Sequence, residues 1–312
     1  MQDALHAVAY TNLTAPSKLF VRAMQHISRF AVPRGLPRIG WVGRRIFLGK
    51  GFKKINYRNR FHICCDTDSY HNVMFGYGIE NRQLEQLFTR ILKPGDVFFD
   101  IGANIGMVTL QACSTPHTAG QIDAHCFEPD PNAFAWLKTN CDLNSFRITL
   151  NQCAIGMAQG KADLTISTVS GWSTMASEPP DGFSFLTKAA KTMVDVLAID
   201  DYCCDKQVTP ALVKIDVEGF ETEVVRGAAK TLTTAKPILI IEVNPMRLKS
   251  ANSSDGELFE LLASYGYQVF HIDPKKISTT ADRQIHDGMP EARANDVREG
   301  EISDVLGIAL TK

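Results

Sequence analysis

Short apolar runs alternate with amphipathic stretches over most of the chain, beginning near residue 97. The apolar runs predict strands, and apolar residues at helical spacing predict helices between them. We expect strands at 97–101, 122–128, 148–154, 211–217, 237–243, 267–272 and 304–311. We expect helices near 105–114, 131–143, 219–233 and 255–265.

This alternation predicts an α/β fold with a mostly parallel sheet and helices on both faces. No clear helix separates the last two expected strands, which favours an antiparallel pairing at the end of the sheet. Residues 161–167 and 192–200 predict an inserted hairpin or extra strands. Residues 274–303 form a long polar segment with Gly and Pro, and such segments are usually functional lids or disordered loops.

The N-terminal residues show a different pattern. Residues 17–31 have apolar side chains at helical spacing with basic residues between them. They predict a helix that packs on the domain, with an interfacial membrane helix or a targeting peptide as alternatives. The Pro and Gly residues between 33 and 40 indicate a linker, and residues 44–75 predict a small β-rich lead-in. Residues 80–92 predict a helix closed by a turn.

The charge is distributed unevenly along the chain. The net charge of −1 gives the whole molecule no general attraction for nucleic acid, yet residues 4–65 hold twelve Lys and Arg and no acid. This asymmetry favours contact with a membrane surface, a phosphate-bearing substrate or an acidic partner. Alternatively, basic residues of this segment pack against acidic residues in the rest of the chain. The candidates for such packing are Arg34, Arg44, Arg45 and Lys53. We expect a basic N-terminal extension over 1–75 and a second domain over 76–312.

The eight cysteines form no metal-binding pattern, and no CxxC occurs. Cys113, Cys126, Cys141 and Cys153 fall in apolar elements and are interpreted as small core residues. Free cysteines indicate a reducing compartment, and we expect a cytoplasmic protein. No apolar stretch approaches the length of a transmembrane span.

The most informative motif begins at the end of the expected strand 97–101. A glycine-spaced turn, Gly102-Ala103-Asn104-Ile105-Gly106, follows Asp100 and opens a helix. Such a turn lets the backbone approach a ligand, and the helix offers free N–H groups to an anion such as a carboxylate. Asp100 would accept hydrogen bonds from an ammonium or hydroxyl group. The dinucleotide motif GxGxxG is absent.

Glu128 follows the second expected strand, 28 residues beyond Asp100. An acid at this place is in keeping with binding of two ribose hydroxyls. Alone, it would be interpreted as a surface acid or as part of the next helix start. Together with the glycine turn, it favours a nucleotide-like ligand.

A third cluster combines a lysine with several acids. Strand alternation places Lys214 and Asp216 on one face of the expected strand 211–217. A lysine in a covered parallel strand needs a partner, for which Asp216, Glu218 and Glu242 are the candidates. The alternative interpretation is a buried ion pair that only fixes strand register.

These motifs, with Phe127-Glu128-Pro129 and the segment Lys214-Ile215-Asp216-Val217-Glu218-Gly219-Phe220-Glu221, resemble the FkbM family of S-adenosylmethionine-dependent methyltransferases. The resemblance covers about residues 75–250. It implies a Rossmann-like class I methyltransferase fold with a seven-stranded sheet whose last strand is antiparallel. It also implies O-methylation of sugars or small hydroxylated metabolites.

The resemblance assigns site residues to this chain. S-adenosylmethionine would be held at its methionine part by the turn at Asp100, Gly102, Ala103, Asn104 and Gly106, at its ribose by Glu128, and near its adenine by Asn151 to Ala154. Ser173, Thr174, Glu221 and Glu242 would be substrate contacts.

We interpret the Lys214 cluster as the catalytic group. A hydroxyl is a poor nucleophile unless a base takes its proton, so Asp216 or Glu218 would be the base and Lys214 would set its charge state. An alternative is a divalent cation held by Asp216, Glu242 and Asn244. Two other classes remain open: a cofactor-binding protein without chemistry, and an NAD-dependent oxidoreductase. The acceptor would be a small molecule or glycan, anionic or lipid-linked.

Overall fold

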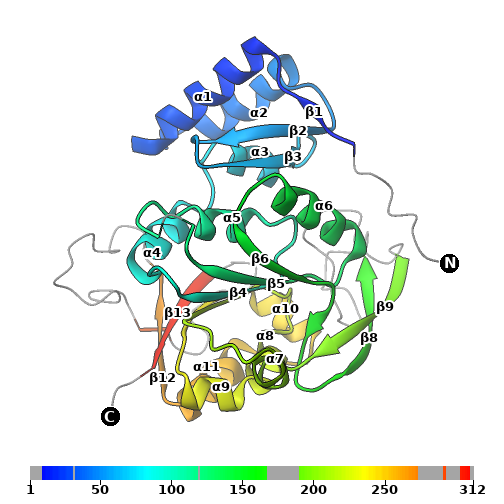
Figure 1. Ribbon diagram of the computed structural model, residues 1–312, viewed down its shortest axis with the longest axis vertical. Coiled ribbons are helices and arrows are strands. Elements are labelled where there is room, and N and C mark those ends of the chain that lie inside the picture. Colours follow the sequence, from blue (N-terminus) through cyan, green and yellow to red (C-terminus); the bar gives the residue numbers. More distant parts are fainter. Residues whose placement is uncertain are drawn as a thin grey trace.

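The computed structural model describes residues 9–30, 32–118, 120–166, 190–272, 291–292 and 303–309. A seven-stranded sheet lies at its centre, with strand order β12-β13-β11-β10-β4-β5-β6 (Figure 1). Its strands are β4 (Val97–Ile101), β5 (Asp123–Phe127), β6 (Arg147–Asn151), β10 (Leu212–Ile215), β11 (Ile238–Val243), β12 (Tyr267–His271) and β13 (Ser303–Ala309).

The sheet is parallel from β11 through β10, β4 and β5 to β6. β13 lies between β11 and β12 and is antiparallel to both. The expected mostly parallel sheet and the antiparallel pairing at its end are therefore confirmed. This strand order places the carboxyl ends of β4, β5, β10 and β11 along one edge.

Helices cover both faces of the sheet because neighbouring strand residues point to opposite sides. Phe98 packs with residues of α4 and α5 on one face, and Phe99 packs with residues of α7 to α11 on the other. The helices are α4 (Arg82–Ile91), α5 (Met107–Cys113), α6 (Pro131–Asp142), α7 (Ile199–Lys206), α8 (Glu221–Arg226), α9 (Ala229–Thr234), α10 (Pro245–Ser250) and α11 (Asp255–Ser264).

The strand expected over 148–154 is confirmed as far as Asn151, in β6, but it is not a single strand, because the chain leaves the main sheet after Asn151. Residues 154 and 155 form β7 (Ala154–Ile155), which pairs with Val196 and Leu197. β7 joins β8 (Gly160–Ile166) and β9 (Ala190–Leu197) in a separate sheet of order β7-β9-β8. The expected extra strands are confirmed, except that residues 199 and 200 begin α7.

The single helix expected over 219–233 is also wrong, because it is interrupted between α8 and α9. Gly227 approaches the backbone of Gly156 so closely that a Cβ would overlap its carbonyl oxygen. The carbonyl of Gly227 accepts from the Asp200 N–H at 3.0 Å. The Asp200 carboxylate then accepts from the N–H groups of Lys230 and Thr231, each at 2.8 Å, and so restarts the helix as α9.

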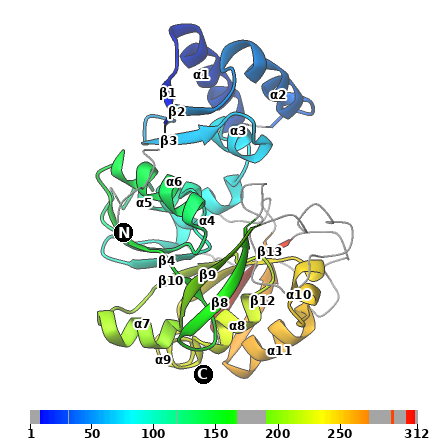
Figure 2. The same cartoon turned by 90° about the vertical axis from the view of Figure 1, so that its right-hand side faces the viewer.

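The N-terminal residues form a lobe that packs above α5 and α6 in Figure 1 and is separated from the central sheet in Figure 2. Its elements are β1 (Thr11–Asn12), α1 (Ala15–Phe30), α2 (Leu36–Phe47), β2 (Phe52–Tyr57), β3 (Phe61–Asp66) and α3 (Tyr70–Gly76). None of the helices within the described ranges is long and apolar enough to cross a membrane.

The linker expected at residues 33–40 is confirmed only for 33–35, and it is wrong for 36–40 because α2 begins at Leu36. Pro37 is tolerated in the first turn, where its missing N–H would have no partner in the helix. A Cβ on Gly40 would lie 2.9 Å from Cε of Met24, so the glycine lets α1 and α2 approach. The β-rich lead-in is confirmed for β2 and β3, whereas residues 44–47 and 70–75 are helical.

The lobe and the remainder share one interface. Leu110 of α5 belongs to the hydrophobic core of the lobe. Arg58 and Arg60 both form ion pairs with Glu85 of α4. Asn140 of α6 accepts from the Cys64 N–H at 2.7 Å. The domain boundary expected between residues 75 and 76 stays a prediction.

Only part of the basic segment lies against acids. Arg44 pairs with Asp68 at 3.1 Å, and Lys53 donates to Oγ1 of Thr11 at 2.7 Å. Within the described ranges, Arg34 and Arg45 have no acidic partner within 4 Å. The uneven charge is therefore not fully neutralised inside the molecule.

All eight cysteines are free. Cys113, Cys126, Cys141 and Cys153 are buried, which confirms their interpretation as core residues.

Candidate functional site

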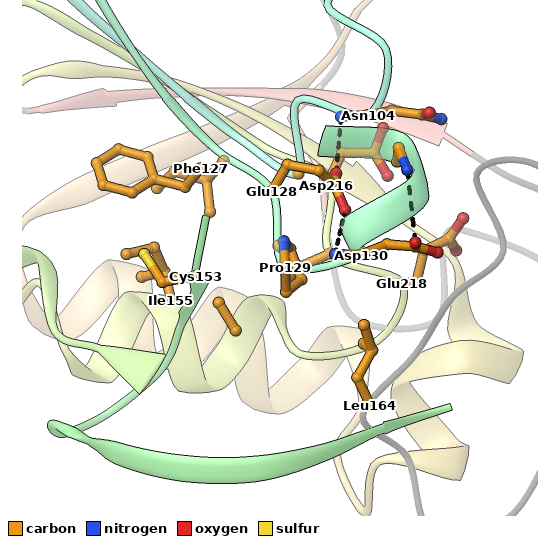
Figure 3. A pocket seen from close by; sticks show the side chains of 15 residues that line it. Asn104, Phe127, Glu128, Pro129, Asp130, Cys153, Ile155, Leu164, Asp216 and Glu218 are labelled. Atoms are coloured by element: carbon orange, nitrogen blue, oxygen red, sulfur yellow. Dashed lines mark hydrogen bonds between the residues drawn. The ribbon is translucent and has the colours of Figure 1, made fainter. Parts of the chain in front are cut away.

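A cavity with about 680 Å³ of empty space lies at the carboxyl ends of β4, β5 and β10 (Figure 3). Open α/β sheets bind ligands at this edge. The residues that follow the strands form one wall, and apolar residues of β7 and β8 form another. The lining residues are Ile101, Gly102, Asn104, Phe127, Glu128, Pro129, Asp130, Ala133, Cys153, Ala154, Ile155, Leu164, Asp216, Val217 and Glu218.

The glycine turn after β4 is fixed by a close approach of two backbones. Gly102 has a φ of +83°, and a Cβ here would overlap the carbonyl oxygen of Asp216. Its N–H donates to the carbonyl of Phe127 at 2.9 Å. Only glycine meets both requirements, so Gly102 joins the ends of β4, β5 and β10 at the cavity.

Glu128 joins the two turns that follow β4 and β5. Its carboxylate accepts from the N–H of Asn104 at 2.8 Å and from the N–H of Asp130 at 2.9 Å (Figure 3). Burial raises the pKa of Glu128 to about 7. Each carboxylate oxygen keeps a lone pair, so the side chain has capacity for two further donors.

The cavity combines one unsatisfied acceptor with an apolar slot. Oδ1 of Asn104 is buried and has no hydrogen-bond partner within the described residues. Phe127, Ile155 and Leu164 supply apolar surface on the opposite side (Figure 3). The donor that Asn104 lacks and the apolar residues on the opposite side fit a ligand with an ammonium group and a flat ring system, as S-adenosylmethionine has.

Asp100 does not line the cavity. It is fully buried, and its Oδ2 accepts from the Thr109 hydroxyl at 2.5 Å. Burial raises its pKa, and the Lys214 ammonium opposes that rise. Asp100 therefore lies behind the glycine turn, as a support for it.

Other residues expected at the cofactor also lie outside the lining. Ala103 donates its N–H to the carbonyl of Phe127 at 3.1 Å, and Gly106 precedes α5 with a φ of +87°. The side chain of Asn151 donates to the carbonyl of Cys126 at 3.0 Å. Ala103, Gly106 and Asn151 therefore shape the turns, whereas Gly102, Asn104, Glu128 and Ala154 line the cavity.

Lys214 and Asp216 form an ion pair on β10 and the loop after it, with Nζ and Oδ2 2.5 Å apart. Lys214 is buried, which lowers its pKa, but the carboxylates of Asp216, Asp100 and Glu242 outweigh this effect and raise it. The lysine is therefore a fixed cation among acids.

Glu218 lies in the same loop and faces the cavity (Figure 3). It pairs with Nε of Arg247 at 2.7 Å, a partner that the sequence pattern did not reveal. Burial and the nearby Asp216 raise the pKa of Glu218 to about 8, against the opposing effect of Arg247. A carboxyl group with this pKa exchanges its proton near neutral pH.

Glu221 holds the loop from beneath. Its Oε1 accepts from the N–H groups of Val217 and Gly219, both at 3.1 Å. Glu221 is buried and does not line the cavity, and burial raises its pKa to about 7. It therefore supports the loop that carries Asp216 and Glu218 instead of facing a substrate.

The acids extend beyond the cavity lining. Carboxylate oxygens of Asp216, Glu218 and Glu242 lie within 4.8 Å of one another. Asp216 and burial raise the pKa of Glu242 well above its ordinary value. Asp304 of β13 lies opposite Glu242 in the strand register. An acid inside an expected apolar strand was the signal that could have identified Asp304 from the sequence.

The expected cation ligand Asn244 has another role. Its side chain caps α10 by accepting from the N–H groups of Met246 at 3.1 Å and Arg247 at 3.3 Å. The carboxylate set that could hold a divalent cation therefore contains Glu218 in place of Asn244. Ser173, Thr174 and most of 274–303 lie outside the described residues.

Comparison with known proteins identifies a family model. Residues 100–269 match the model described as the methyltransferase FkbM domain, which is more than half of the chain. These residues run from Asp100 through the glycine turn, Glu128 and the Lys214 cluster to β12.

Three curated relatives are similar over about half of the chain. The 31-O-demethyl-FK506 methyltransferase FkbM of Streptomyces tacrolimicus is 27% identical over 57% of this chain and 75% of the relative. The 2-O-methyltransferase NoeI of Sinorhizobium fredii is 26% identical over 58% and 76%. The hexuronic acid methyltransferase AglP of Haloferax volcanii is 25% identical over 49% and 57%.

Proposed function

Since this chain belongs to the FkbM methyltransferase family, we propose that it transfers a methyl group from S-adenosylmethionine to a hydroxyl group of a sugar or a small hydroxylated metabolite. The observation that carries the proposal is the cavity where Gly102 and Glu128 lie beside Asp216 and Glu218. The relatives named 31-O-demethyl-FK506 methyltransferase and hexuronic acid methyltransferase support this acceptor class.

Different residues of the cavity would contact different parts of the cofactor. Asn104, with the backbone at Gly102, would hold the amino acid end, because its Oδ1 lacks a donor. Glu128 would accept from the ribose hydroxyls, and the apolar residues Phe127, Ile155 and Leu164 would hold the adenine ring. When bound, S-adenosylmethionine supplies an electrophilic methyl group.

Glu218 and Asp216 act on the acceptor. Methyl transfer needs a hydroxyl group held in line with the methyl group, and it gains from a base that takes the hydroxyl proton as the bond forms. Glu218 is the better candidate for this base, because its carboxyl group faces the cavity and its pKa is about 8. Lys214 keeps a positive charge beside Asp216 and so limits repulsion among the acids.

A divalent cation is the alternative way to activate the hydroxyl group. The carboxylates of Asp216, Glu218 and Glu242 are close enough to bind one. Turnover that persists in a strong chelator excludes this alternative, whereas loss of turnover that Mg²⁺ or Mn²⁺ restores supports it.

Binding and turnover together test the proposed function. Calorimetry with S-adenosylhomocysteine and with NAD distinguishes a methyltransferase from an oxidoreductase, and binding of NAD alone contradicts the proposal. Asp216→Asn and Glu218→Gln should each keep cofactor affinity while turnover of a sugar acceptor falls by about 10²- to 10⁴-fold. A third outcome is that the wild type binds the cofactor but methylates no sugar or small hydroxylated acceptor. This outcome would favour a binding protein without chemistry.

We also propose that the acceptor is anionic or lipid-linked and that the protein is cytoplasmic. The unneutralised cations of residues 4–65 support the first proposal, and α1 includes residues 17–30 of the expected membrane-contact segment 17–31. Eight free cysteines support the second. A comparison of neutral and phosphorylated sugar acceptors in the turnover assay tests the preference for charge.

A further inference from the structure

α1 and α2 form the outermost layer of the N-terminal lobe, on the side away from the central sheet (Figures 1 and 2). They pack on each other through Phe20 of α1, whose ring stacks on Phe47 of α2 with centroids 4.4 Å apart. Gly43 of α2 lies against the same ring. The contact fixes which sides of the two helices face outward.

α2 carries an exposed apolar row. Ile39, Val42 and Ile46 follow one another at spacings of three and four residues, and their exposed fractions are 61%, 55% and 75%. This spacing places them on one side of the helix, away from the buried Leu36 and Gly40. An apolar row of this kind is costly to expose to water and indicates a binding surface.

α1 carries a second row beside the first. Leu19 is 71% exposed and Ile27 is 43% exposed, with Ala23 between them on the same side of the helix. Helical periodicity places this row next to Phe20, and therefore next to α2. Seven of the ten large apolar side chains exposed in the described residues lie between residues 19 and 47, so the patch is a local feature of these two helices.

Basic residues border the two apolar rows. Helical periodicity places Lys18, Arg22 and Arg29 along the outer edge of α1, and Arg38 and Arg45 along the outer edge of α2. None of these five has an acidic partner within 4 Å in the part of the chain that the structure describes. The surface is therefore apolar in the middle and positive at both edges.

The positive edge of α1 continues into a groove. Lys18 and Arg22 line it together with Lys54 and His62 of the adjacent strands, and it encloses about 740 Å³. Burial lowers the pKa of His62, and the nearby Lys54 lowers it further. The groove extends the area that attracts anionic groups.

We propose that the α1–α2 face binds the surface of an anionic lipid bilayer. The apolar rows would enter the boundary between headgroups and acyl chains, and the basic edges would contact the anionic headgroups. A second copy of the chain fits poorly, because it would bring five further cations against the first five. The proposal concerns where the protein docks and does not depend on the methyl acceptor.

Co-sedimentation of the full chain with vesicles tests the proposal, without cofactor or acceptor. Vesicles of phosphatidylcholine alone are compared with vesicles in which about one third of the lipid is phosphatidylglycerol. We expect binding at least about tenfold tighter to the anionic vesicles, weakened as salt is raised. Absence of binding to the anionic vesicles, or equal binding to both kinds, overturns the proposal.

Variants of exposed residues assign the binding to this face. The triple change Ile39→Ser, Val42→Ser and Ile46→Ser removes one apolar row, and Arg38→Glu with Arg45→Glu reverses one basic edge. Each should weaken binding by about tenfold or more. The matched controls are Met193→Ser and Lys230→Glu, which are exposed elsewhere and should bind as the wild type does.

Two measurements keep the result decisive. Circular dichroism and the melting temperature report whether the triple variant folds. If it does not fold, the arginine variant still tests the face, because it changes only exposed charges. Light scattering reports the oligomeric state. Binding that survives both sets of variants overturns the proposal, as does a dimer of the wild type that the variants lose.

Discussion

Glu218 combines a left-handed backbone conformation with a shifted pKa. Its φ of +59° costs a residue with a Cβ about 1–2 kcal/mol, and Gly219 follows with a φ of +109°. Glu221 and Arg247 hold this conformation through the loop N–H groups and the Glu218 carboxylate. Strain of this kind is usual where side chains are held for a reaction.

The pH dependence of turnover follows from Glu218. Its pKa is raised to about 8, so the carboxylate that we propose as the base is a minority near pH 7 and grows as the pH rises. We expect kcat to rise with pH, with a midpoint near 8, and to be lost in Glu218→Gln. Arg247 stabilises the carboxylate, so Arg247→Gln should move the midpoint to higher pH. A wild-type rate that does not change between about pH 6 and 9 contradicts the assignment.

The sequence predicts the residues of the site better than their roles. Gly102, Asn104, Glu128, Asp216 and Glu218 were expected from strand ends and turn patterns, and all five line the cavity. The pattern could not separate residues that face the ligand from residues that hold the turns, because both kinds occur together in the motifs.

Buried support residues are the clearest example of this limit. Asp100 and Glu221 stand in the most informative motifs, yet both are buried under the turns they stabilise. Arg247 comes from a helix that the sequence pattern did not predict. Its pairing with Glu218 depends on tertiary packing, which strand and helix periodicity do not describe.

The turns after β4 and β10 interlock at Gly102. We expect Gly102→Ala to destabilise the protein by about 3 kcal/mol or more, because the added Cβ meets the backbone oxygen of Asp216 in a conformation that disfavours side chains. Binding of S-adenosylhomocysteine should be lost with it. Denaturant unfolding and calorimetry measure the two effects.

Gly95 provides the matched control for Gly102. It has a φ of +89° but nothing lies within 4 Å of a Cβ built there. Gly95→Ala should therefore cost only the backbone strain and leave cofactor affinity unchanged. If the two alanine variants lose equal stability and affinity, the interlocking of the turns is refuted.

At the scale of elements, the main sheet could be predicted because each of its strands has its own apolar run. The errors occur where backbones meet. β6 and β7 were joined because no glycine or proline marks the turn at 152–153, and α8 and α9 were joined because their apolar pattern continues across Gly227. The linker at 33–40 was expected because proline and glycine usually interrupt helices. Here they also occur inside α2, where proline lies in the first turn and glycine lets two helices approach.

The two parts of the molecule are tied by buried polar groups. Asn140 of α6 is fully buried, accepts from the Cys64 N–H at 2.7 Å and donates to the carbonyl of Ile105 at 2.8 Å. Asn140→Ala leaves both backbone groups without these partners, which costs about 2–4 kcal/mol in total. We expect a lower melting temperature in a single transition, because lobe and sheet unfold together.

Lys138→Ala is the control on the same helix. Its side chain is exposed and its ion pair with Asp142 is on the surface, so the change should cost less than about 0.5 kcal/mol. Calorimetry that resolves two transitions in the wild type would show instead that the lobe unfolds independently.

The position of β13 determines the order in which the molecule can be completed during synthesis. β12 is made before β13 but pairs with the sheet only through it. Until residues 303–309 have left the ribosome, β11 has an open edge, and Glu242 lacks the neighbouring strand that carries Asp304. The pairing of β12 with the sheet and the placement of Asp304 opposite Glu242 therefore occur in the same late step, and a nascent chain that still lacks β13 has neither.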